Sequence, residues 1–123
     1  MASQKGRCNC GSVTVSLRSS PAEAAACHCL NCRRTGGACS VNYLVDESEA
    51  DVDDKQGQLK EYRDSDTKSG NTVTRSFCQT CGSAVVTKSL KFPGKLFLKA
   101  SLFDKVAPVK REVYTEDRID WEI

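Results

Sequence analysis

Seven of the eight cysteines in this 123-residue chain fall into three short groups, and this clustering constrains the fold more than any other feature. The groups are Cys8-Asn9-Cys10-Gly11, Cys27-His28-Cys29-Leu30-Asn31-Cys32 and Cys78-Gln79-Thr80-Cys81-Gly82. Eight cysteines in 123 residues lie below the roughly 8–10% that is typical of a disulfide scaffold. The sequence shows no signal peptide and no apolar run that could span a membrane, so we expect a cytoplasmic protein whose clustered thiols bind metal.

Two of the cysteine groups end alike, with a glycine directly after the second cysteine. Gly11 and Gly82 would let the chain turn past a bound ion without a Cβ clash. Thiolates on two such turns can converge on one Zn²⁺ at about 2.3 Å and complete a tetrahedron. We therefore predict a closed, structural zinc site that ties the N-terminal strand to a distant hairpin, with the ligands Cys8, Cys10, Cys78 and Cys81.

The remaining group, Cys27, Cys29 and Cys32, supplies three ligands. Three protein ligands with a fourth position left for water or substrate are typical of a catalytic zinc. Two alternatives stay open: Cys39 closes the site as a fourth ligand, or no second metal binds. Cys39 lies on the apolar side of a predicted strand, where a free cysteine is commonly a small buried hydrophobe. The ring of His28 is expected to point away, because both of its neighbours are ligands.

Hydrophobic alternation predicts a mainly β protein with short helical turns. Strands are expected over residues 12–19, 39–45 and 95–101, with a hairpin formed by 72–77 and 83–87, a weaker strand near Leu59 and Tyr62, and short extended pieces around Val113, Tyr114, Ile119 and Trp121. Residues 20–23, Ser-Pro-Ala-Glu, begin either a short helix or an extended segment leading to Cys27. Residues 35–37 are expected to end a helical turn, and the acidic stretch 46–58 to form a solvated loop.

Length and charge favour one domain over residues 1–123 and exclude some partners. The net charge is +2, and no basic block or basic stripe with interleaved aromatic residues is present, so we expect neither nucleic acid nor a membrane as partner. Arg33 and Arg34 either balance an anionic metal cluster and attract an anionic ligand, or serve only as solvated surface charge. The oligomeric state is not predicted.

The order of these motifs is similar to that of a known family. C-x-C-G, then C-H-C-x-x-C-R-R-x-G-G, then F-C-x-x-C-G-S, with an ending of Tyr114, Arg118 and Trp121, resembles the glutathione-dependent formaldehyde-activating (GFA) family, which includes centromere-protein-V-like proteins. The resemblance implies a β-tent of small antiparallel sheets pinned by zinc. It also assigns Cys8, Cys10, Cys78 and Cys81 to the structural zinc and Cys27, Cys29 and Cys32 to a catalytic one.

The activity that this resemblance implies is the formation of S-(hydroxymethyl)glutathione from glutathione and formaldehyde, a carbon–sulfur lyase reaction. We therefore expect an enzyme with two zinc ions per chain that acts on a thiol adduct of an aldehyde or a related small molecule. The alternative is a non-catalytic, zinc-stabilised module that binds glutathione or a protein partner. The sequence identifies neither an acid–base pair nor a glutathione contact.

Overall fold

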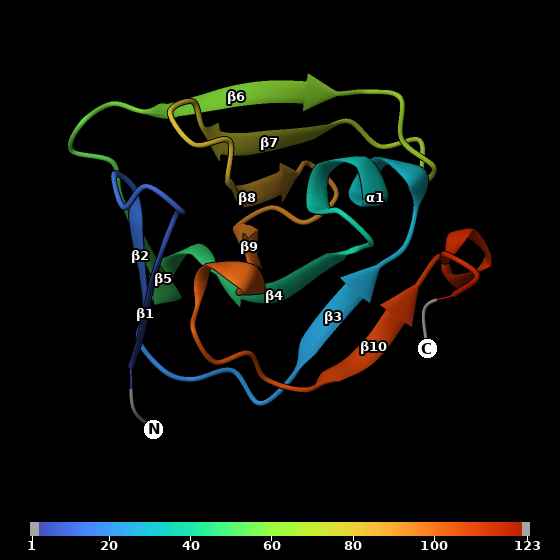
Figure 1. Cartoon of the computed structure of the whole chain (residues 1–123), viewed down its shortest axis with the longest axis horizontal. Helices are drawn as coiled ribbons and strands as arrows, with labels where there is room; N and C mark the ends of the chain where they lie inside the picture. Colours follow the sequence, from blue (N-terminus) through green and yellow to red (C-terminus); the bar gives the residue numbers. More distant parts are fainter. Residues whose placement is uncertain (1–2, 122–123) are drawn as a thin grey trace.

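The computed structural model describes residues 3–121 as ten β-strands, one α-helix and three short 3-10 helices (Figure 1). The strands are β1 (Gln4–Arg7), β2 (Thr14–Leu17), β3 (Ala24–Cys27), β4 (Ser40–Asp46), β5 (Ala50–Asp53), β6 (Leu59–Asp64), β7 (Val73–Cys78), β8 (Ala84–Ser89), β9 (Lys95–Lys99) and β10 (Val109–Val113). The helices are α1 (Leu30–Gly36), η1 (Glu47–Glu49), η2 (Ala100–Leu102) and η3 (Thr115–Asp117). The predicted mainly β fold is confirmed.

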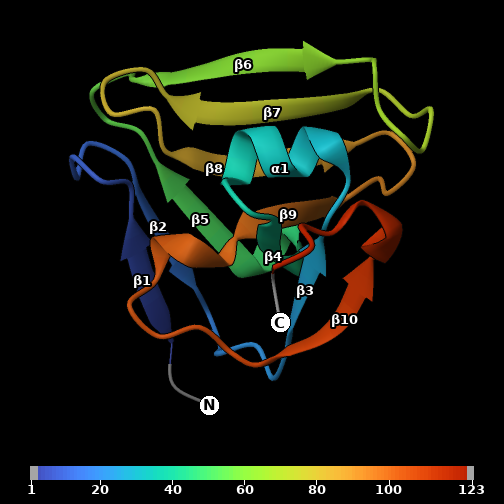
Figure 2. The same cartoon turned by 45° about the vertical axis from the view of Figure 1, so that its right-hand side comes forward.

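The strands form two sheets, which Figures 1 and 2 show from two directions. The smaller sheet has the order β1-β2-β5, and the larger has the order β10-β3-β4-β9-β8-β7-β6. Neighbouring strands run antiparallel except β10, which runs parallel to β3 at one edge of the larger sheet. The parallel pair was not predicted. It arises because β10 returns to β3 after most of the chain, and no tight turn forces the two strands to run in opposite directions.

Two segments differ from the sequence-based expectation, and a third settles an open choice. The solvated loop predicted for 46–58 is wrong over Ala50–Asp53, because this segment pairs with β2 as β5. The strand β1 was not predicted at all. Residues 24–27 adopt the extended alternative, because β3 hydrogen-bonds to β4 on one side and β10 on the other. At the C-terminal end, the chain turns at Tyr114, which has a φ of 55°, and then enters η3.

The hydrophobic core lies between the two sheets. Val13, which precedes β2, is buried with Val15 and Leu17 of β2. Leu98 of β9 belongs to the same buried cluster. Burying an aliphatic side chain of this size stabilises the fold by about 1.5–3 kcal/mol. Tyr43 of β4 completes this layer: its ring lies 5.8 Å from that of Phe103, and its hydroxyl accepts a hydrogen bond of 2.9 Å from the backbone of Ala107.

The helix α1 begins directly after Cys29 and ends at Gly37, whose φ of 99° is a conformation that favours glycine. The predicted helical turn is therefore confirmed. Seven residues are too few for a stable isolated helix in water, so packing against the protein must hold α1 in place. In Figure 2, α1 lies over the strands β7, β8 and β9. Within residues 3–121, no helix has the length and apolar character needed to cross a membrane.

Candidate metal centres

The structure brings four cysteines of the first and last groups together. The Sγ atoms of Cys8, Cys10, Cys78 and Cys81 all lie within 4.8 Å of one another. The Sγ of Cys10 is 3.7 Å from that of Cys8 and 3.8 Å from that of Cys78. A tetrahedron with metal–sulfur bonds of about 2.3 Å has edges of about 3.8 Å. The spacing of these thiols therefore fits Zn²⁺, although Cys10 and Cys78 are 68 residues apart in the sequence.

The two turns that carry these cysteines are similar, although the second is one residue longer. The amide of Gly11 donates to the carbonyl of Cys8 at 3.0 Å, and the amide of Gly82 donates to the carbonyl of Cys78 at 2.7 Å. Both glycines have a positive φ, 83° for Gly11 and 79° for Gly82. A residue with a Cβ would strain this backbone, which explains why each pair is followed by glycine. Each turn thereby directs its two thiols to the same side.

Hydroxyl groups surround the four-cysteine cluster, and sequence inspection did not identify them. The Oγ of Ser12 lies 3.1 Å from the sulfur of Cys10 and 3.3 Å from that of Cys78. The Oγ of Ser83 lies 3.2 Å from the sulfur of Cys81, and hydrogen bonds from Ser83 lower the pKa of that thiol to about 5. Such contacts orient metal-binding thiolates and favour their charged form.

The second group also converges. The Sγ atoms of Cys27, Cys29 and Cys32 lie within 4.8 Å of one another, and those of Cys27 and Cys29 are 3.5 Å apart. Cys27 ends β3, Cys29 immediately precedes α1, and Cys32 lies in the first turn of that helix. The tight change of direction from strand to helix is what brings the three sulfurs together. The donor set is one that zinc prefers.

Hydrogen bonding within this cluster distributes the negative charge unequally. The side-chain hydrogen bond with Cys27 lowers the pKa of Cys32 to about 6, against the opposing effect of burial. The same hydrogen bond, together with burial, raises the pKa of Cys27. Three thiolates at this separation repel one another, so a divalent cation would be needed to hold all of them deprotonated. The chemistry of the cluster therefore fits a metal ion.

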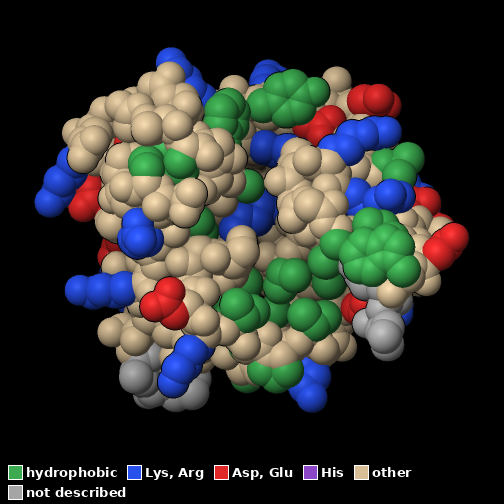
Figure 3. All heavy atoms as spheres, in the orientation of Figure 1, with side chains coloured by type: hydrophobic (Ala, Val, Ile, Leu, Met, Phe, Trp, Pro, Cys, Tyr) green, Lys and Arg blue, Asp and Glu red, His purple; other side chains and the backbone are tan. Residues whose placement is uncertain are grey.

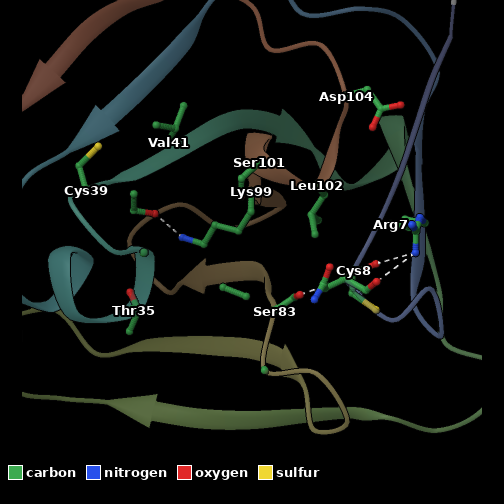
Figure 4. Close-up of a pocket in the computed structure, with 15 residues that line it drawn as sticks. Arg7, Cys8, Thr35, Cys39, Val41, Ser83, Lys99, Ser101, Leu102 and Asp104 are labelled. Atoms are coloured by element: carbon green, nitrogen blue, oxygen red, sulfur yellow. Dashed lines mark hydrogen bonds between the residues drawn. The ribbon is translucent and has the colours of Figure 1, made fainter.

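Cys39 lies outside the three-cysteine group. Within residues 3–121, no fourth cysteine, histidine or carboxylate places a ligand atom within 4.8 Å of all three sulfurs. Cys39 is half-buried and lines a cavity near Val41 (Figure 4). His28, between two of the cysteines, is 1% exposed, and its Nε2 lies 2.9 Å from Oε1 of Glu112 on β10. Sequence inspection did not identify Glu112 as a partner of His28, and the contact between them helps to hold the strand-to-helix turn.

Two cavities share part of their lining, and one of them includes Cys8 of the four-cysteine cluster. One, of about 490 Å³, is drawn in Figure 4, and extends from Cys8 to Cys39. The other, of about 400 Å³, lies between α1 and the strands β7 and β8. Both cavities are lined by Thr35, Gly82, Ala84 and Lys99, so they adjoin, and together they are called the groove here. A groove of this size accommodates a small organic ligand.

Lys99 is the central side chain of the groove, and in Figure 4 it extends from β9 into the cavity. Only 6% of the residue is exposed, and its Nζ donates to Oγ of Ser40 at 2.6 Å and to Oδ1 of Asn42 at 2.8 Å. Burial lowers the pKa of Lys99 to about 8, although the negative charge of Cys32 opposes this effect. Sequence inspection missed Lys99, because alternation placed it opposite the apolar residues of its strand, where lysine is normally solvated.

A second basic residue reaches the groove through a buried network. Nε of Arg75 on β7 donates to Oδ2 of Asp64 at 2.9 Å, and both side chains are largely buried. Nδ2 of Asn31, the residue before Cys32, donates to the same Asp64 oxygen at 3.0 Å and to the carbonyl of Asp66 at 2.8 Å. The network therefore fixes α1 and its cysteine to β6 and β7. The sequence offered no pattern from which this network could be found.

Comparison with known proteins identifies the family. Residues 3–117 match the model of the family described as "Glutathione-dependent formaldehyde-activating enzyme" (GFA). The fold is similar to a crystal structure of a Rhodobacter sphaeroides protein, with a TM-score of 0.65 and 24% sequence identity over 85% of this chain and 98% of the other. None of the curated proteins matches the chain. Because the family model covers nearly the whole chain, this protein belongs to the GFA family.

Proposed function

We propose that this protein is a zinc-dependent enzyme of the carbon–sulfur lyase type, which forms or cleaves the adduct between a thiol and an aldehyde, with glutathione as the thiol. The observation that carries the proposal is the three-cysteine cluster, which is one ligand short of a tetrahedron. Its Cys32 lies within electrostatic range of Lys99 and Arg75, which line the groove. Membership of the GFA family agrees with this chemistry. The proposed ligand is a small molecule of the size of glutathione.

Two zinc ions would have different roles. Cys8, Cys10, Cys78 and Cys81 would hold a structural zinc, because four thiols close its coordination. Cys27, Cys29 and Cys32 would hold the second zinc. A zinc ion in such a site supplies Lewis acidity and favours the deprotonated form of a thiol that binds to it.

The side chains around the second site would position its cysteine ligands and balance their charge. The contact between His28 and Glu112 fixes the turn that carries Cys27 and Cys29. The buried ammonium group of Lys99 would balance the negative charge of the thiolates. No Asp or Glu within residues 3–121 forms an ion pair with it. Among the described residues we assign no general acid or base.

Zinc content and reaction rate test the proposal together. Elemental analysis should find two zinc ions per chain in the wild type and in Cys39→Ala, and one in Cys32→Ser. The rate of adduct formation from glutathione and formaldehyde must exceed the uncatalysed rate. Cys32→Ser should abolish that excess and Cys39→Ala should retain it.

Three results would contradict the enzyme assignment. An unchanged rate in Cys32→Ser would show that the three-cysteine cluster is not the reactive site. Calorimetric binding of glutathione without any rate enhancement would identify a binding module instead. If Cys39→Ala fell to one zinc ion, Cys39 would be a ligand and the second site would be closed.

A further inference from the structure

The face of the larger sheet beneath α1 carries several polar side chains, whereas its opposite face carries the core residues Tyr43 and Leu98. The strand registers bring these polar side chains together: Asn42 lies opposite Lys99, and Thr87 lies opposite Arg75. Thr87 also lies opposite Phe97, and side chains two residues apart on a strand share a face, so Lys99 and Thr87 point to the same side. The sheet itself therefore brings Arg75, Thr87 and Lys99 into one cavity, which all three line.

This cavity is positively charged. Arg34 of α1, Arg75 and Lys99 line it, and no Asp or Glu is among its lining residues. Asp64 balances Arg75, but Lys99 has no carboxylate partner within residues 3–121. Lys99 donates two of its three N–H groups to Ser40 and Asn42, which fixes its position and leaves one donor. The space-filling view shows basic side chains gathered around a hollow near the middle of the molecular face (Figure 3).

A second observation also indicates a ligand. Thr87 is 8% exposed, and its Oγ1 has no hydrogen-bond partner in the described part of the chain. Buried hydroxyl groups are almost always hydrogen-bonded, and an exception requires an explanation. Because Thr87 lines the cavity that Lys99 and Arg75 also line, an acceptor bound there could take its hydrogen bond.

We propose that Lys99, Thr87, Arg75 and Arg34 form a carboxylate-binding subsite, which holds the anionic end of the thiol ligand beside the three-cysteine cluster. The inference rests on the proposed function for the identity of that ligand. Carboxylates accept hydrogen bonds from ammonium, guanidinium and hydroxyl donors, all of which this cavity presents. The subsite lies close to the cluster, because Ser40, which accepts a hydrogen bond from Lys99, pairs with Cys27 across β3 and β4.

The subsite selects for ligands that combine a thiol with a carboxylate. A thiol without a carboxylate would leave the buried donors of Lys99 and Thr87 unpaired, and that loss penalises its binding. Lys99 and Thr87 are therefore specificity-determining residues. They determine which thiol is held, and the cysteines determine where its sulfur lies.

Calorimetry with zinc-loaded protein tests this subsite separately from the thiol chemistry. The probe is S-methylglutathione, which keeps both carboxylates but cannot offer a thiolate. We expect it to bind the wild type, to bind Lys99→Met about tenfold or more weakly, and to bind Thr87→Val several-fold more weakly. Lys110→Met, which removes an exposed charge on β10, is the matched control and should bind like the wild type.

The outcomes separate the two proposals. If S-methylglutathione does not bind the wild type, or binds Lys99→Met and Thr87→Val as tightly as the wild type, the subsite is wrong. Equal affinity of glutathione and its diethyl ester would also overturn it, since the ester has no carboxylate. Lys99-dependent binding of S-methylglutathione by a protein with no catalytic rate would support the subsite and contradict the lyase. If Lys99→Met does not fold, Thr87→Val alone decides, because valine has nearly the same shape.

Discussion

Two buried hydroxyl groups lie on the same face of the larger sheet. Removing one should lower the free energy of unfolding, and removing the other should raise it. Ser40 is 2% exposed, and its Oγ accepts a hydrogen bond of 2.6 Å from the ammonium group of Lys99. Thr87 is 8% exposed, and its Oγ1 has no partner within residues 3–121. Ser40→Ala and Thr87→Val each delete one hydroxyl at nearly constant shape. The pair therefore isolates the effect of hydrogen bonding from that of packing.

The expected magnitudes follow from what each hydroxyl loses. A hydrogen bond to a charged group contributes about 1.5–3 kcal/mol, so Ser40→Ala should lower the free energy of unfolding by about 2 kcal/mol. An unpaired buried hydroxyl costs about 1–3 kcal/mol, so Thr87→Val should raise the free energy of unfolding by about 1 kcal/mol. For a domain of this size, 1 kcal/mol corresponds to a shift of about 3–6 °C in Tm.

Urea unfolding of zinc-loaded protein, followed by circular dichroism, measures both changes under one condition. Equal metal loading is necessary, because bound metal contributes to the apparent stability. The reasoning is refuted if Thr87→Val is destabilised by 1 kcal/mol or more, since the hydroxyl would then have a partner in the unliganded protein. That result would also remove the unpaired hydroxyl of Thr87 as support for the carboxylate subsite.

Three further outcomes follow from the structure. Cys78→Ser should reduce the zinc content by one ion and unfold the protein at moderate temperature, because structural zinc contributes about 10–16 kcal/mol in zinc-finger peptides; a Tm close to that of the wild type would contradict the structural role. Glu112→Gln should weaken zinc binding at the three-cysteine site about 10–100-fold in a chelator competition, whereas the exposed Glu116→Gln should not. Binding of S-methylglutathione should weaken as the pH rises through about 8, because Lys99, whose pKa is lowered to about 8, loses its charge there; calorimetry of Lys99→Met should show no such change.

The convergence of the cysteines is the part of this structure that local sequence predicts well. Cys8 and Cys78 each begin a turn in which glycine follows the second cysteine, and both the turn and its direction depend on a few adjacent residues. The same holds for the helix that follows Cys29 and ends at Gly37. Alternation predicted β4 and β9, since a strand with one apolar face reveals its period.

The groove, in contrast, depends on residues that are far apart in the sequence. Lys99 looks like a solvated residue of an alternating strand, and its burial arises from α1 lying above and from Ser40 and Asn42 on the neighbouring strand. Arg75 reaches the same cavity only because β7 pairs with β8. The failed prediction at Ala50–Asp53 has the same cause, because a polar segment becomes a strand when a neighbour offers it hydrogen bonds.

By itself, the sequence determined that the chain is mainly β and that seven of its thiols gather into one group of four and one group of three, each able to hold a metal ion. These properties depend on the spacing of residues that are close in the sequence. A metal ion requires ligands at short intervals, and a strand repeats every two residues. Only the tertiary structure decided that Cys39 stays outside the three-cysteine group, that His28 meets Glu112, and that three basic side chains surround one cavity. Strand register decides such contacts, because it selects which distant residues share a face.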